Sequence, residues 1–598
     1  MCGIIGYVGD GHDTADVLLD GLSGLEYRGY DSAGIALANA TLDVFKREGE
    51  VSALESALEG ADVHGGAVGI GHTRWSTHGP PSDANAHPHT DERNRVAVVH
   101  NGIIENYQEI RDELTAAGVT FVSETDTEVV PHLIGQALDA GYDPEEAFRR
   151  AVDRIEGSYA IAAVFVGSET IYAARESSPL VLGVGDEGHY LASDVPAFVE
   201  YTDRVIYLDD GEFARIEEGG IVVTDREGLV VETSIETIEW DPEETGKSGY
   251  DHYMQKEIYE QPTSLRQCLR GRVDELEGEI VLEELADLAV EGPVQFVACG
   301  TSYHAALYGS ALLQERGIPA QAFLASEYAS ERIPVGEDHL VVGVTQSGET
   351  ADTMRALREA SAAGAETLAV TNVVASSAAR ECDHALYIRA GPEIGVAATK
   401  TFASQQVALT ALACVIGGGD SREVVRGLRS VPDKVQTVLD ESTAREVAAE
   451  FVDADAYFFI GRHYQYPVAL EGALKMKEIT YKHAEGFAAG ELKHGPLALV
   501  TERTPVFALV TGDGEIARKT IGNVKEVEAR GAPVVAVTDG QSDVEQYADH
   551  VLRVPTSTPV AAATVANVQL QLVAYWVANM LGRSIDKPRN LAKSVTVE

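Results

Sequence analysis

The chain has 598 residues, of which 45% are apolar, and its 46 basic and 95 acidic side chains give a formal net charge of −49. This length exceeds what one hydrophobic core supports, so several domains are expected, and the composition is typical of compact α/β proteins, not of fibrous or disordered chains. The negative charge argues against nucleic acid and anionic membranes as partners. Because the acids are dispersed and only 13 residues are lysine, the composition favours adaptation to a very salty cytoplasm over an ordinary acidic enzyme.

The lengths of the apolar runs and the spacing of the cysteines argue against a membrane, secreted, disulfide-bonded or zinc-binding protein. No apolar run is long enough to span a bilayer, and the first ten residues lack the basic region of a signal peptide. The five cysteines are far apart and contain no CxxC pair, which argues against a disulfide framework or a structural zinc site. We therefore expect a cytoplasmic protein.

The first 220 residues are predicted to be rich in β-strand, with two helices, over 106–117 and 126–140. Short apolar or alternating runs predict strands over 4–8, 67–72, 96–100, 159–166, 180–184 and 205–208.

Cys2 follows the initiator methionine directly, and three explanations compete: chance, a secretion or lipid-anchor signal, and a nucleophile that removal of Met1 exposes. A signal would need a leader before the cysteine, so we set it aside. On an N-terminal cysteine the α-amine, with a pKa of about 7.7–8.0, lies beside a thiol of about 8.5 and can take its proton near neutral pH. The sequence therefore favours a nucleophile at the start of the first strand.

Two other strand ends carry groups that suit attack on an amide. In VVHNGIIENY (98–107) the strand is expected to end at His100, which places Asn101 and Gly102 in a turn, either as donors to an oxyanion or as a plain hairpin turn. GHTRWSTHGPPSDANAHPH (71–89) adds Arg74 and Trp75 with several hydroxyl groups, enough to hold an amino-acid carboxylate. The histidines of this segment lack the cysteine or carboxylate spacing that completes a metal site, so no metal is expected.

Residues 239–250, rich in acids with Pro and Gly, are predicted to form an exposed linker, and a helix after them begins a second unit. From there the chain repeats itself at an offset of about 161 to 167 residues. VQFVACGTSYHAALYGSALLQE (294–315) pairs with YFFIGRHYQYPVALEGALKMKE (457–478), and LVVGVTQSGET (340–350) with VFALVTGDGEI (506–516). Apolar strands that alternate with helices predict a duplicated, doubly wound parallel sheet.

Two loops of the first repeat are candidates for an anion site, because open parallel sheets bind ligands beyond the carboxyl ends of their strands. CGTS (299–302) and TQSGET (345–350) each follow a predicted strand, precede a predicted helix and carry hydroxyl groups. Such loops bind phosphate with the free N–H groups of a helix N-terminus, although Ser and Thr also serve as ordinary helix caps. Neither loop matches GxxxxGK[ST], so a nucleotide is not expected.

Charged residues in the last quarter of the chain suit proton transfer. Four of the 13 lysines fall within 475–493, and Lys475 and Glu478 share one face of a predicted helix, as a catalytic pair or as a surface ion pair. Lys593 lies in a polar tail without a core pattern. Proton transfer beside a carbonyl or imine needs one carboxylate and no redox cofactor, so no cofactor is expected.

These motifs resemble those of known families. MCGIIGYVG, LEYRGYDSAGIA, HTRWSTHG and VHNGIIENY are similar to the class II (N-terminal-nucleophile) glutamine amidotransferase domain. TQSGET, ALEGALKMKEITY, GELKHGPLAL and PRNLAKSVTVE are similar to the sugar-isomerase (SIS) domains and tail of the glutamine–fructose-6-phosphate aminotransferase family, which the chain resembles essentially end to end. The resemblance implies an α/β fold: an αββα N-terminal-nucleophile domain followed by two doubly wound, parallel-sheet SIS domains.

The resemblance also implies the division of the chain and its reaction. The expected parts are a glutamine amidotransferase domain over 1–238, a linker over 239–250, SIS domains over 251–430 and 440–585, and an active-site tail over 586–598. The expected reaction transfers the amide nitrogen of L-glutamine to fructose 6-phosphate with ketose-to-aldose isomerisation, giving glucosamine 6-phosphate and glutamate. The enzyme is expected to be a cytoplasmic homodimer.

Roles follow for the matching residues. In the glutaminase domain Cys2 would be the nucleophile, Asn101 and Gly102 the oxyanion hole and Trp75 the gate of an ammonia passage. The α-carboxylate and α-amine of glutamine would be held by Arg74, Thr77, His78 and Asp126. In the sugar half Lys593 would form an imine with the open-chain ketose, Glu478 would move a proton between C1 and C2, and His494 would assist ring opening. The remaining sugar-binding positions would be Thr301, Ser302, Thr345, Gln346, Ser347, Thr350 and Lys475.

The sequence departs from the family pattern at Thr345 and Ala398, where Ser is usual, and after Ser302, where SYHAA lacks a common Asn. We expect these departures to affect affinity for the sugar and not the type of reaction. Two alternatives are an amidotransferase that uses phosphoribosyl diphosphate, which the duplicated repeat opposes, and a non-catalytic sugar-phosphate sensor. The presence of all four candidate catalytic groups, Cys2, Glu478, His494 and Lys593, opposes the sensor.

Overall fold

The computed structural model describes residues 2–59, 66–238, 246–274, 277–290, 292–374 and 376–596. They form two compact units, Met1–Thr245 with Ala592–Glu598, and Gly246–Leu591. Residues 239–245 of the predicted linker and 597–598 of the predicted tail lie outside the described residues.

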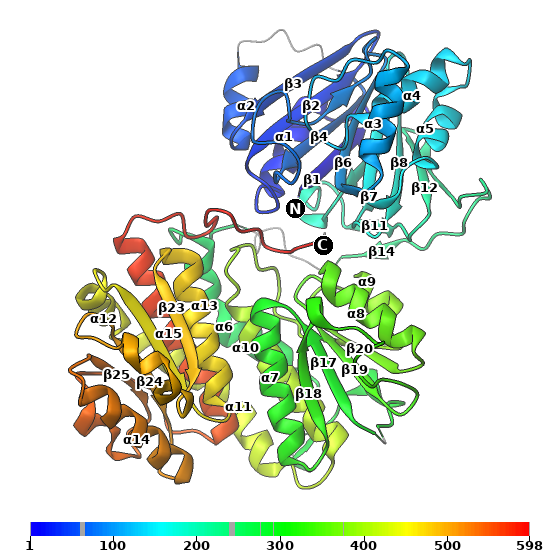
Figure 1. Ribbon diagram of the computed structural model, residues 1–598. Coiled ribbons are helices and arrows are strands. Elements are labelled where there is room, and N and C mark those ends of the chain that lie inside the picture. The colour runs from blue at the N-terminus through cyan, green and yellow to red at the C-terminus, as the bar shows by residue number, and fades with distance from the viewer. Residues whose placement is uncertain are drawn as a thin grey trace. The chain divides into compact units, whose positions relative to one another are not determined.

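The first unit is built on two antiparallel sheets that pack face to face between helices (Figure 1). In sheet order, the first sheet contains β14 (Glu236–Thr237), β11 (Arg204–Tyr207), β9 (Val181–Val184), β10 (His189–Ala192), β1 (Gly3–Val8), β4 (Val68–Arg74), β2 (Ser32–Ala38) and β3 (Leu42–Glu48). The second contains β13 (Gly220–Thr224), β12 (Phe213–Glu217), β8 (Thr170–Glu176), β7 (Gly157–Phe165), β6 (Val96–Ile104) and β5 (His89–Thr90). A buried apolar cluster that includes Ile4, Ile70 and Val99 fills the space between them.

In the described residues five helices cover the outer faces: the helices predicted over 106–117 and 126–140 are present, and three more were missed. α1 (Thr14–Gly24) and α2 (Val51–Leu58) pack on the first sheet, and α3 (Tyr107–Ala116), α4 (Val129–Asp139) and α5 (Pro144–Val152) on the second. The missed helices are short, and α1 contains glycines that lower helix propensity. Gly21 also allows close packing, since a Cβ there would lie 2.7 Å from Cγ1 of Ile5. Tertiary packing therefore stabilises helices that the local sequence pattern does not predict.

The second unit contains two five-stranded parallel sheets of the same topology, which confirms the predicted duplication. The first repeat has β17 (Val294–Ala298), α7 (Gly300–Glu315), β18 (Ala320–Leu324), β19 (Leu340–Val344), α8 (Ala351–Ala362), β20 (Glu366–Thr371), α9 (Ser377–Glu381), β21 (His384–Tyr387) and α10 (Lys400–Gly417). The second has β22 (Ala456–Gly461), α13 (Gln465–Thr480), β23 (His483–Ala488), β24 (Val506–Val510), α14 (Glu515–Glu528), β25 (Val534–Thr538), β26 (His550–Arg553) and α15 (Pro559–Met580). The strand orders are β18-β17-β19-β20-β21 and β23-β22-β24-β25-β26.

Three further helices join the repeats: α6 (Tyr253–Leu269), α11 (Arg422–Glu441) and α12 (Ala444–Phe451). With α7, α10, α13 and α15 they contribute to one large apolar core between the two sheets, while α8 and α14 cover the outer faces. Short elements are β15 (Val273–Asp274) and β16 (Glu279–Ile280), with the 3₁₀ turns η1 (Val195–Ala197), η3 (Glu283–Leu285), η4 (Ala325–Glu327), η5 (Glu491–His494), η6 (Pro496–Leu499) and η7 (Asp543–Tyr547). Contrary to the expectation from sequence, one helix of the described residues, α15, is long and apolar enough to cross a membrane, but 89% of its apolar window is buried inside the protein.

The strand order fixes where the first repeat can bind a ligand. β17 lies between β18 and β19, so the connections leaving these strands diverge at the carboxyl ends of β17 and β19. CGTS (299–302) follows β17, and TQSGET (345–350) follows β19. Both candidate phosphate loops therefore lie at the topological switch point of their sheet.

Candidate active sites

Cys2 is half-buried and directly precedes β1. The pairing of Gly3 with Thr73 brings it beside the end of β4, where the backbone N–H of Trp75 donates to Sγ at 3.2 Å. The Cys2 carbonyl accepts hydrogen bonds from Nδ2 of Asn101 at 2.9 Å and from Nε of Arg28 at 3.2 Å. Three chain segments thus hold the thiol at a strand end. The sequence motifs pointed to Asn101 but not to Arg28.

Asn101 and Gly102 do not form the predicted turn. β6 continues to Ile104, and the two residues pair with Ala160 and Tyr159 of β7. Gly102 has a φ of +129°, and a Cβ there would lie 2.0 Å from the Ser158 carbonyl oxygen, so glycine lets the strand continue through this conformation. Asn-Gly here is neither a hairpin turn nor the end of a strand.

A stack of buried histidines lies behind Asn101. Nε2 of His72 is 3.1 Å from Oδ1 of Asn101 and 3.1 Å from Nδ1 of His87. The rings of His72 and His87, and of His87 and His89, have centroids 4.1 and 4.7 Å apart. Burial lowers the pKa of His72 to about 3 and also lowers the pKa of His87, His89 and His100, so these rings are uncharged at neutral pH. From sequence, His72, His87 and His89 were considered only as metal ligands.

The residues expected to hold glutamine gather around the same strand ends. Arg74 is buried, and its guanidinium donates to the carbonyl oxygens of His78 and, at 3.1 Å, Gly79. Burial lowers the pKa of Arg74, and the nearby Cys2, Asp126 and Asp31 oppose that shift.

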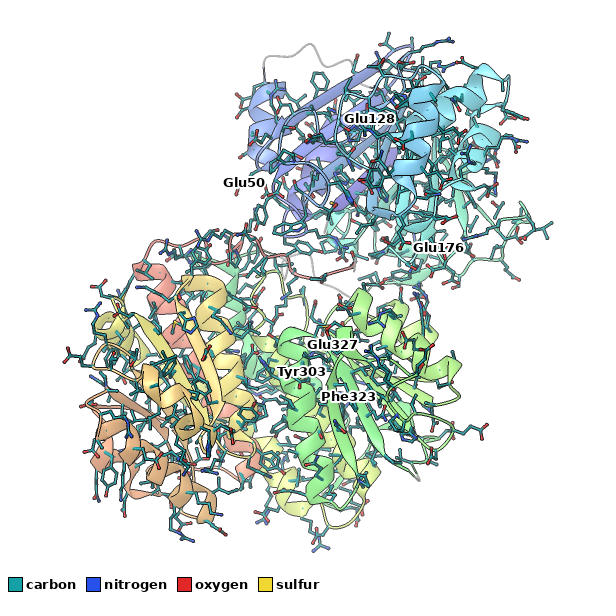
Figure 2. The ribbon with its side chains drawn as sticks, in the orientation of Figure 1. Glu50, Glu128, Glu176, Tyr303, Phe323 and Glu327 are labelled. Atoms are coloured by element: carbon teal, nitrogen blue, oxygen red, sulfur yellow. The ribbon has the colours of Figure 1, made fainter. Side chains whose placement is uncertain are left out.

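The other expected glutamine ligands differ in exposure. Asp126 is buried and accepts a hydrogen bond from the backbone N–H of Ile104 at 2.9 Å. Thr77 is exposed, with Oγ1 3.4 Å from Nδ1 of the half-buried His78. Trp75 is half-buried and packs edge-on against Tyr30. Glu128, labelled in Figure 2 just before α4, anchors the preceding turn through the backbone N–H groups of residues 122 and 123, 2.7 Å away in each case.

In the second unit, α13 carries a line of charged side chains toward α7. Nζ of Lys475 lies 2.6 Å from Oε2 of Glu478 and 3.3 Å from Oε1 of Glu471. Oγ1 of Thr301 donates to Oε1 of Glu471 at 3.0 Å and accepts from Nζ of Lys475 at 3.2 Å. Nδ1 of His304 lies 2.8 Å from Oε2 of Glu471. We call these five residues the α7–α13 cluster.

Glu471 and Lys475 are buried, and Thr301, His304 and Glu478 are half-buried, so Lys475 and Glu478 are not a surface pair. Burial alone would lower the pKa of Lys475, but Glu471 and Glu478 outweigh it and raise this pKa. Burial would raise the pKa of Glu471, but Lys475, His304 and Thr301 outweigh it and lower this pKa. Both groups are therefore charged in the interior. Glu471 and His304 were not identified from sequence, although the internal repeat aligns Glu471 with Tyr308, a buried position of α7.

The two candidate phosphate loops have ordered hydroxyl groups. Oγ1 of Thr345 lies 3.1 Å from Oγ1 of Thr350 and accepts from the backbone N–H of Gly348 at 3.2 Å. Oγ of Ser347 accepts from the N–H of Glu349 at 3.2 Å. In the other loop, Oγ of Ser302 accepts from Gln405 of α10 at 2.9 Å, and Tyr303, labelled in Figure 2, follows it on α7. Gln346, which stands between Thr345 and Ser347 in the sequence, is half-buried.

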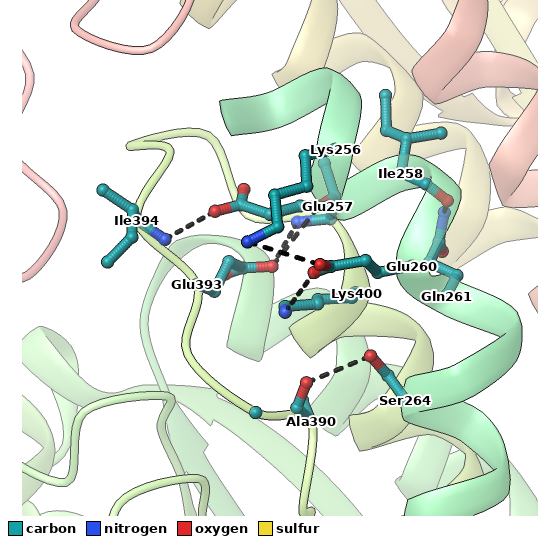
Figure 3. Close-up of polar contacts among 12 residues, drawn as sticks. Lys256, Glu257, Ile258, Glu260, Gln261, Ser264, Ala390, Glu393, Ile394 and Lys400 are labelled. Carbon is teal, nitrogen blue, oxygen red and sulfur yellow. Dashed lines mark hydrogen bonds and ion pairs between the residues drawn. The ribbon is translucent and has the colours of Figure 1, made fainter. Parts of the chain in front are cut away.

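The loop that contains Ala398 is held by buried carboxylates (Figure 3). Glu257 of α6 accepts from the backbone N–H groups of Ile394 and Gly395 at 2.5 and 2.9 Å. Glu393 accepts from the N–H groups of residues 399 and 401, and Lys400 pairs with Glu260 of α6 at 2.7 Å. Because charges are rarely buried without a partner or a task, this network indicates that the position of the loop matters.

Two expected sugar-site residues come from segments other than helices α7 and α13. His494 is exposed at the end of η5, and no hydrogen bond or ion pair joins it to the cluster within the described residues. Lys593 is half-buried in the segment Ala592–Glu598, which groups with the first unit. No set of three or more His, Cys, Asp or Glu side chains among the described residues is arranged to hold a metal ion.

Comparison with known proteins identifies both units. Residues 72–200 match the glutamine amidotransferase domain, and residues 287–415 and 450–581 match the SIS domain. A glutamine–fructose-6-phosphate aminotransferase (isomerizing) from Halobacterium salinarum is 51% identical over 613 aligned residues, which cover 100% of both chains. The chain belongs to the glutamine–fructose-6-phosphate aminotransferase family.

Other members of the aminotransferase family agree with this assignment. The protein of that name from Thermus thermophilus is 47% identical over 609 aligned residues, again covering 100% of both chains. The solved C-terminal domain of glucosamine-fructose-6-phosphate aminotransferase from Francisella tularensis is 35% identical, with a TM-score of 0.53, and covers 57% of this chain and 99% of that one. The expected fold, a glutamine amidotransferase domain followed by two SIS domains, is thereby confirmed.

Proposed function

We propose that this aminotransferase uses Cys2 and the α7–α13 cluster as two separate reaction centres. The first releases nitrogen from L-glutamine, and the second isomerises fructose 6-phosphate, so that together they produce glucosamine 6-phosphate and glutamate. The observation that carries the sugar half is the Lys475–Glu478 pair at 2.6 Å, on a helix whose neighbouring charges are buried.

In the glutaminase centre the Cys2 thiol attacks the side-chain amide carbon of glutamine after removal of Met1 exposes the α-amine as its base. The Trp75 N–H donates to Sγ at 3.2 Å and holds the sulfur at the strand end. One N–H of the Asn101 amide is used by the Cys2 carbonyl, and the other, with the Gly102 N–H, stabilises the oxyanion. The amine returns the proton to departing ammonia, and water hydrolyses the thioester to glutamate. Arg74, Thr77, His78 and Asp126 hold the α-carboxylate and α-amine, and Trp75 gates the passage of ammonia.

In the sugar centre the hydroxyl and N–H groups of Thr301, Ser302, Thr345, Gln346, Ser347 and Thr350 hold the phosphate at the switch point of the first sheet. His494 assists ring opening, and Lys593 forms an imine with C2 of the open-chain ketose, with loss of water. Ammonia from the first centre then adds to C2 and displaces the Lys593 amine, which leaves the transferred nitrogen on C2. Glu478 takes a proton from C1 and returns it to C2, and Lys475 beside it holds the carboxylate in place.

Paired variants test the two centres independently. Cys2→Ala abolishes release of glutamate from glutamine but leaves conversion of fructose 6-phosphate to glucose 6-phosphate. Glu478→Gln lowers that conversion by about 10²–10⁴-fold and leaves glutaminase activity. Both reactions are followed by mass spectrometry, and loss of both activities in either variant contradicts the two-centre assignment.

The remaining expectations complete the proposal. The domain limits are 1–238, 251–430 and 440–585, with a linker over 239–250 and the tail over 586–598. The enzyme is a cytoplasmic homodimer that works in concentrated salt, because its net charge of −49 needs screening to limit self-repulsion. Light scattering and activity measured from 0.1 to 3 M KCl test the last two points; a monomer, or highest activity at low salt, contradicts them.

A further inference from the structure

Glu471 is the central residue of the α7–α13 cluster. It has no exposed surface and yet receives donors from two sides: Thr301 and Lys475 reach Oε1, and His304 reaches Oε2. Glu471 therefore links the imidazole of α7 to the ammonium group of α13, and that ammonium contacts Glu478 at 2.6 Å. A continuous line of contacts runs from His304 to the proposed base.

The charge along this line depends on His304. With an uncharged imidazole, Glu471, Lys475 and Glu478 sum to one negative charge; with an imidazolium they sum to zero. In the interior such a change is felt over several ångströms, because the effective dielectric constant there is far below that of water. Imidazole is the side chain whose charge most readily changes between about pH 5 and 8.

We propose that His304 is a positioning residue for the proton transfer at Glu478: it holds Glu471 against Lys475, and its protonation keeps Glu478 ionised toward acid pH. This inference rests on the proposed role of Glu478. The positive charge of the His304 imidazolium attracts the Glu471 carboxylate and weakens the attraction between Glu471 and Lys475. The Lys475 ammonium then interacts more strongly with Glu478 and stabilises its carboxylate. The groups that face His304 are Glu471 and Lys475 of α13 and the neighbouring Tyr303, while α10 contributes the uncharged Gln405 beside Ser302.

Asparagine separates the hydrogen bond of His304 from its charge. Nδ2 of Asn is as many bonds from the backbone as Nδ1 of His, so His304→Asn can still donate to Glu471 but cannot titrate. His304→Leu removes both the donor and the charge. His384 is a matched control in the same unit, because its Nε2 lies 2.8 Å from Oε1 of Glu366, an imidazole–carboxylate pair outside the site.

The experiment measures kcat/KM for conversion of fructose 6-phosphate to glucose 6-phosphate, without glutamine, from pH 5 to 9 at one KCl concentration. In His304→Asn we expect the rate at pH 8.5 to stay within about threefold of the parent, and the acid limb to move to higher pH by about half to one unit. His304→Leu loses about tenfold or more at every pH, because Glu471 loses a donor. His384→Gln, whose Nε2 is as many bonds from the backbone as the ring Nε2, shows the parent profile.

An acid limb of His304→Asn that superposes on the parent, or a uniform loss at every pH, overturns the inference while leaving the proposed function intact. If the parent enzyme itself does not convert fructose 6-phosphate, the proposed sugar centre fails and this inference fails with it. Thermal unfolding, measured on each variant, establishes that the second unit is folded, because glutaminase activity reports only on the first.

Discussion

The two repeats of the second unit have the same strand order but contribute different groups to the proposed sugar centre. After its first and third strands the first repeat has CGTS and TQSGET, loops rich in hydroxyls, whereas the second has GRHYQ and TGDGE, which place Asp513 where the first has Ser347. In the helices it is the second repeat that carries the polar groups. α13 has the charged Glu471 and Lys475 where α7 has the uncharged Tyr308 and Leu312, and all four side chains are buried.

The difference between the buried residues of α7 and α13 shows which of them the fold requires and which are present for the proposed reaction. Tyr308 and Leu312 show that an apolar side chain satisfies the packing at these helix positions, so the buried charges of α13 are not a requirement of the fold. Burying an ion costs several kcal/mol unless partners compensate it. One repeat therefore supplies neutral anion-binding loops, and the other supplies a charged helix. Three substitutions test this division.

The largest effect is expected from Lys475→Leu, which gives α13 the residue that α7 has at the same position. Glu471 and Glu478 then lose the cation between them, and the protein loses about 3–5 kcal/mol of stability as well as nearly all isomerisation. Thermal unfolding and the isomerisation assay measure the two effects. Lys477→Leu, on an exposed position of the same helix, is the control and should change stability by less than about 0.5 kcal/mol. A stable, active Lys475→Leu enzyme would mean that the charges of α13 are dispensable.

A smaller effect, on the KM for fructose 6-phosphate, is expected to distinguish the loop TQSGET of the first repeat from TGDGE of the second. Ser347→Ala removes a hydroxyl from TQSGET and should raise the KM for fructose 6-phosphate by about 10- to 150-fold, since a hydrogen bond to a charged group contributes about 1.5–3 kcal/mol. Asp513→Ala, the corresponding change in the second repeat, should leave KM unchanged. Equal increases in the two variants would show that both repeats bind the phosphate.

The smallest effect concerns Ala398, in the loop that Glu257 and Glu393 hold. Ala398→Ser restores the hydroxyl usual in the family and should lower the KM for fructose 6-phosphate by about two- to tenfold, the contribution of one neutral hydrogen bond. Initial-rate kinetics with fructose 6-phosphate measure it. An unchanged KM would indicate that this loop does not contact the sugar.

The fold could be predicted from sequence largely because it repeats. Apolar strands followed by glycine turns and helices recur at a fixed offset, so the parallel sheets and the two loops at their switch point were evident. In the first unit α1 could not be predicted, because Gly21 and Gly24 lower its helix propensity. The helix is stabilised instead by its apolar side, which packs on β1 and β4. Asn101-Gly102 was misassigned to a turn, because the pairing partner that extends the strand is about 58 residues away in β7.

The same reasoning explains what was missed in the site. Cys2, Lys475 and Glu478 stand out by position or spacing, but Glu471 resembles many other acids of this chain, and its partners Thr301 and His304 are 170 and 167 residues distant. His72 was considered only as a metal ligand, since nothing local shows that its ring contacts the Asn101 amide. Contacts across large sequence separations carry no local pattern.

The uncharged histidine stack behind Asn101 has a consequence for life in concentrated salt. In molar KCl the Debye length is about 3 Å, so exposed ion pairs lose most of their attraction. Hydrogen bonds between neutral rings and an amide have no net charge to screen. The contacts that hold the Asn101 amide from behind are therefore insensitive to ionic strength, and their geometry is expected to be the same in dilute buffer and in brine.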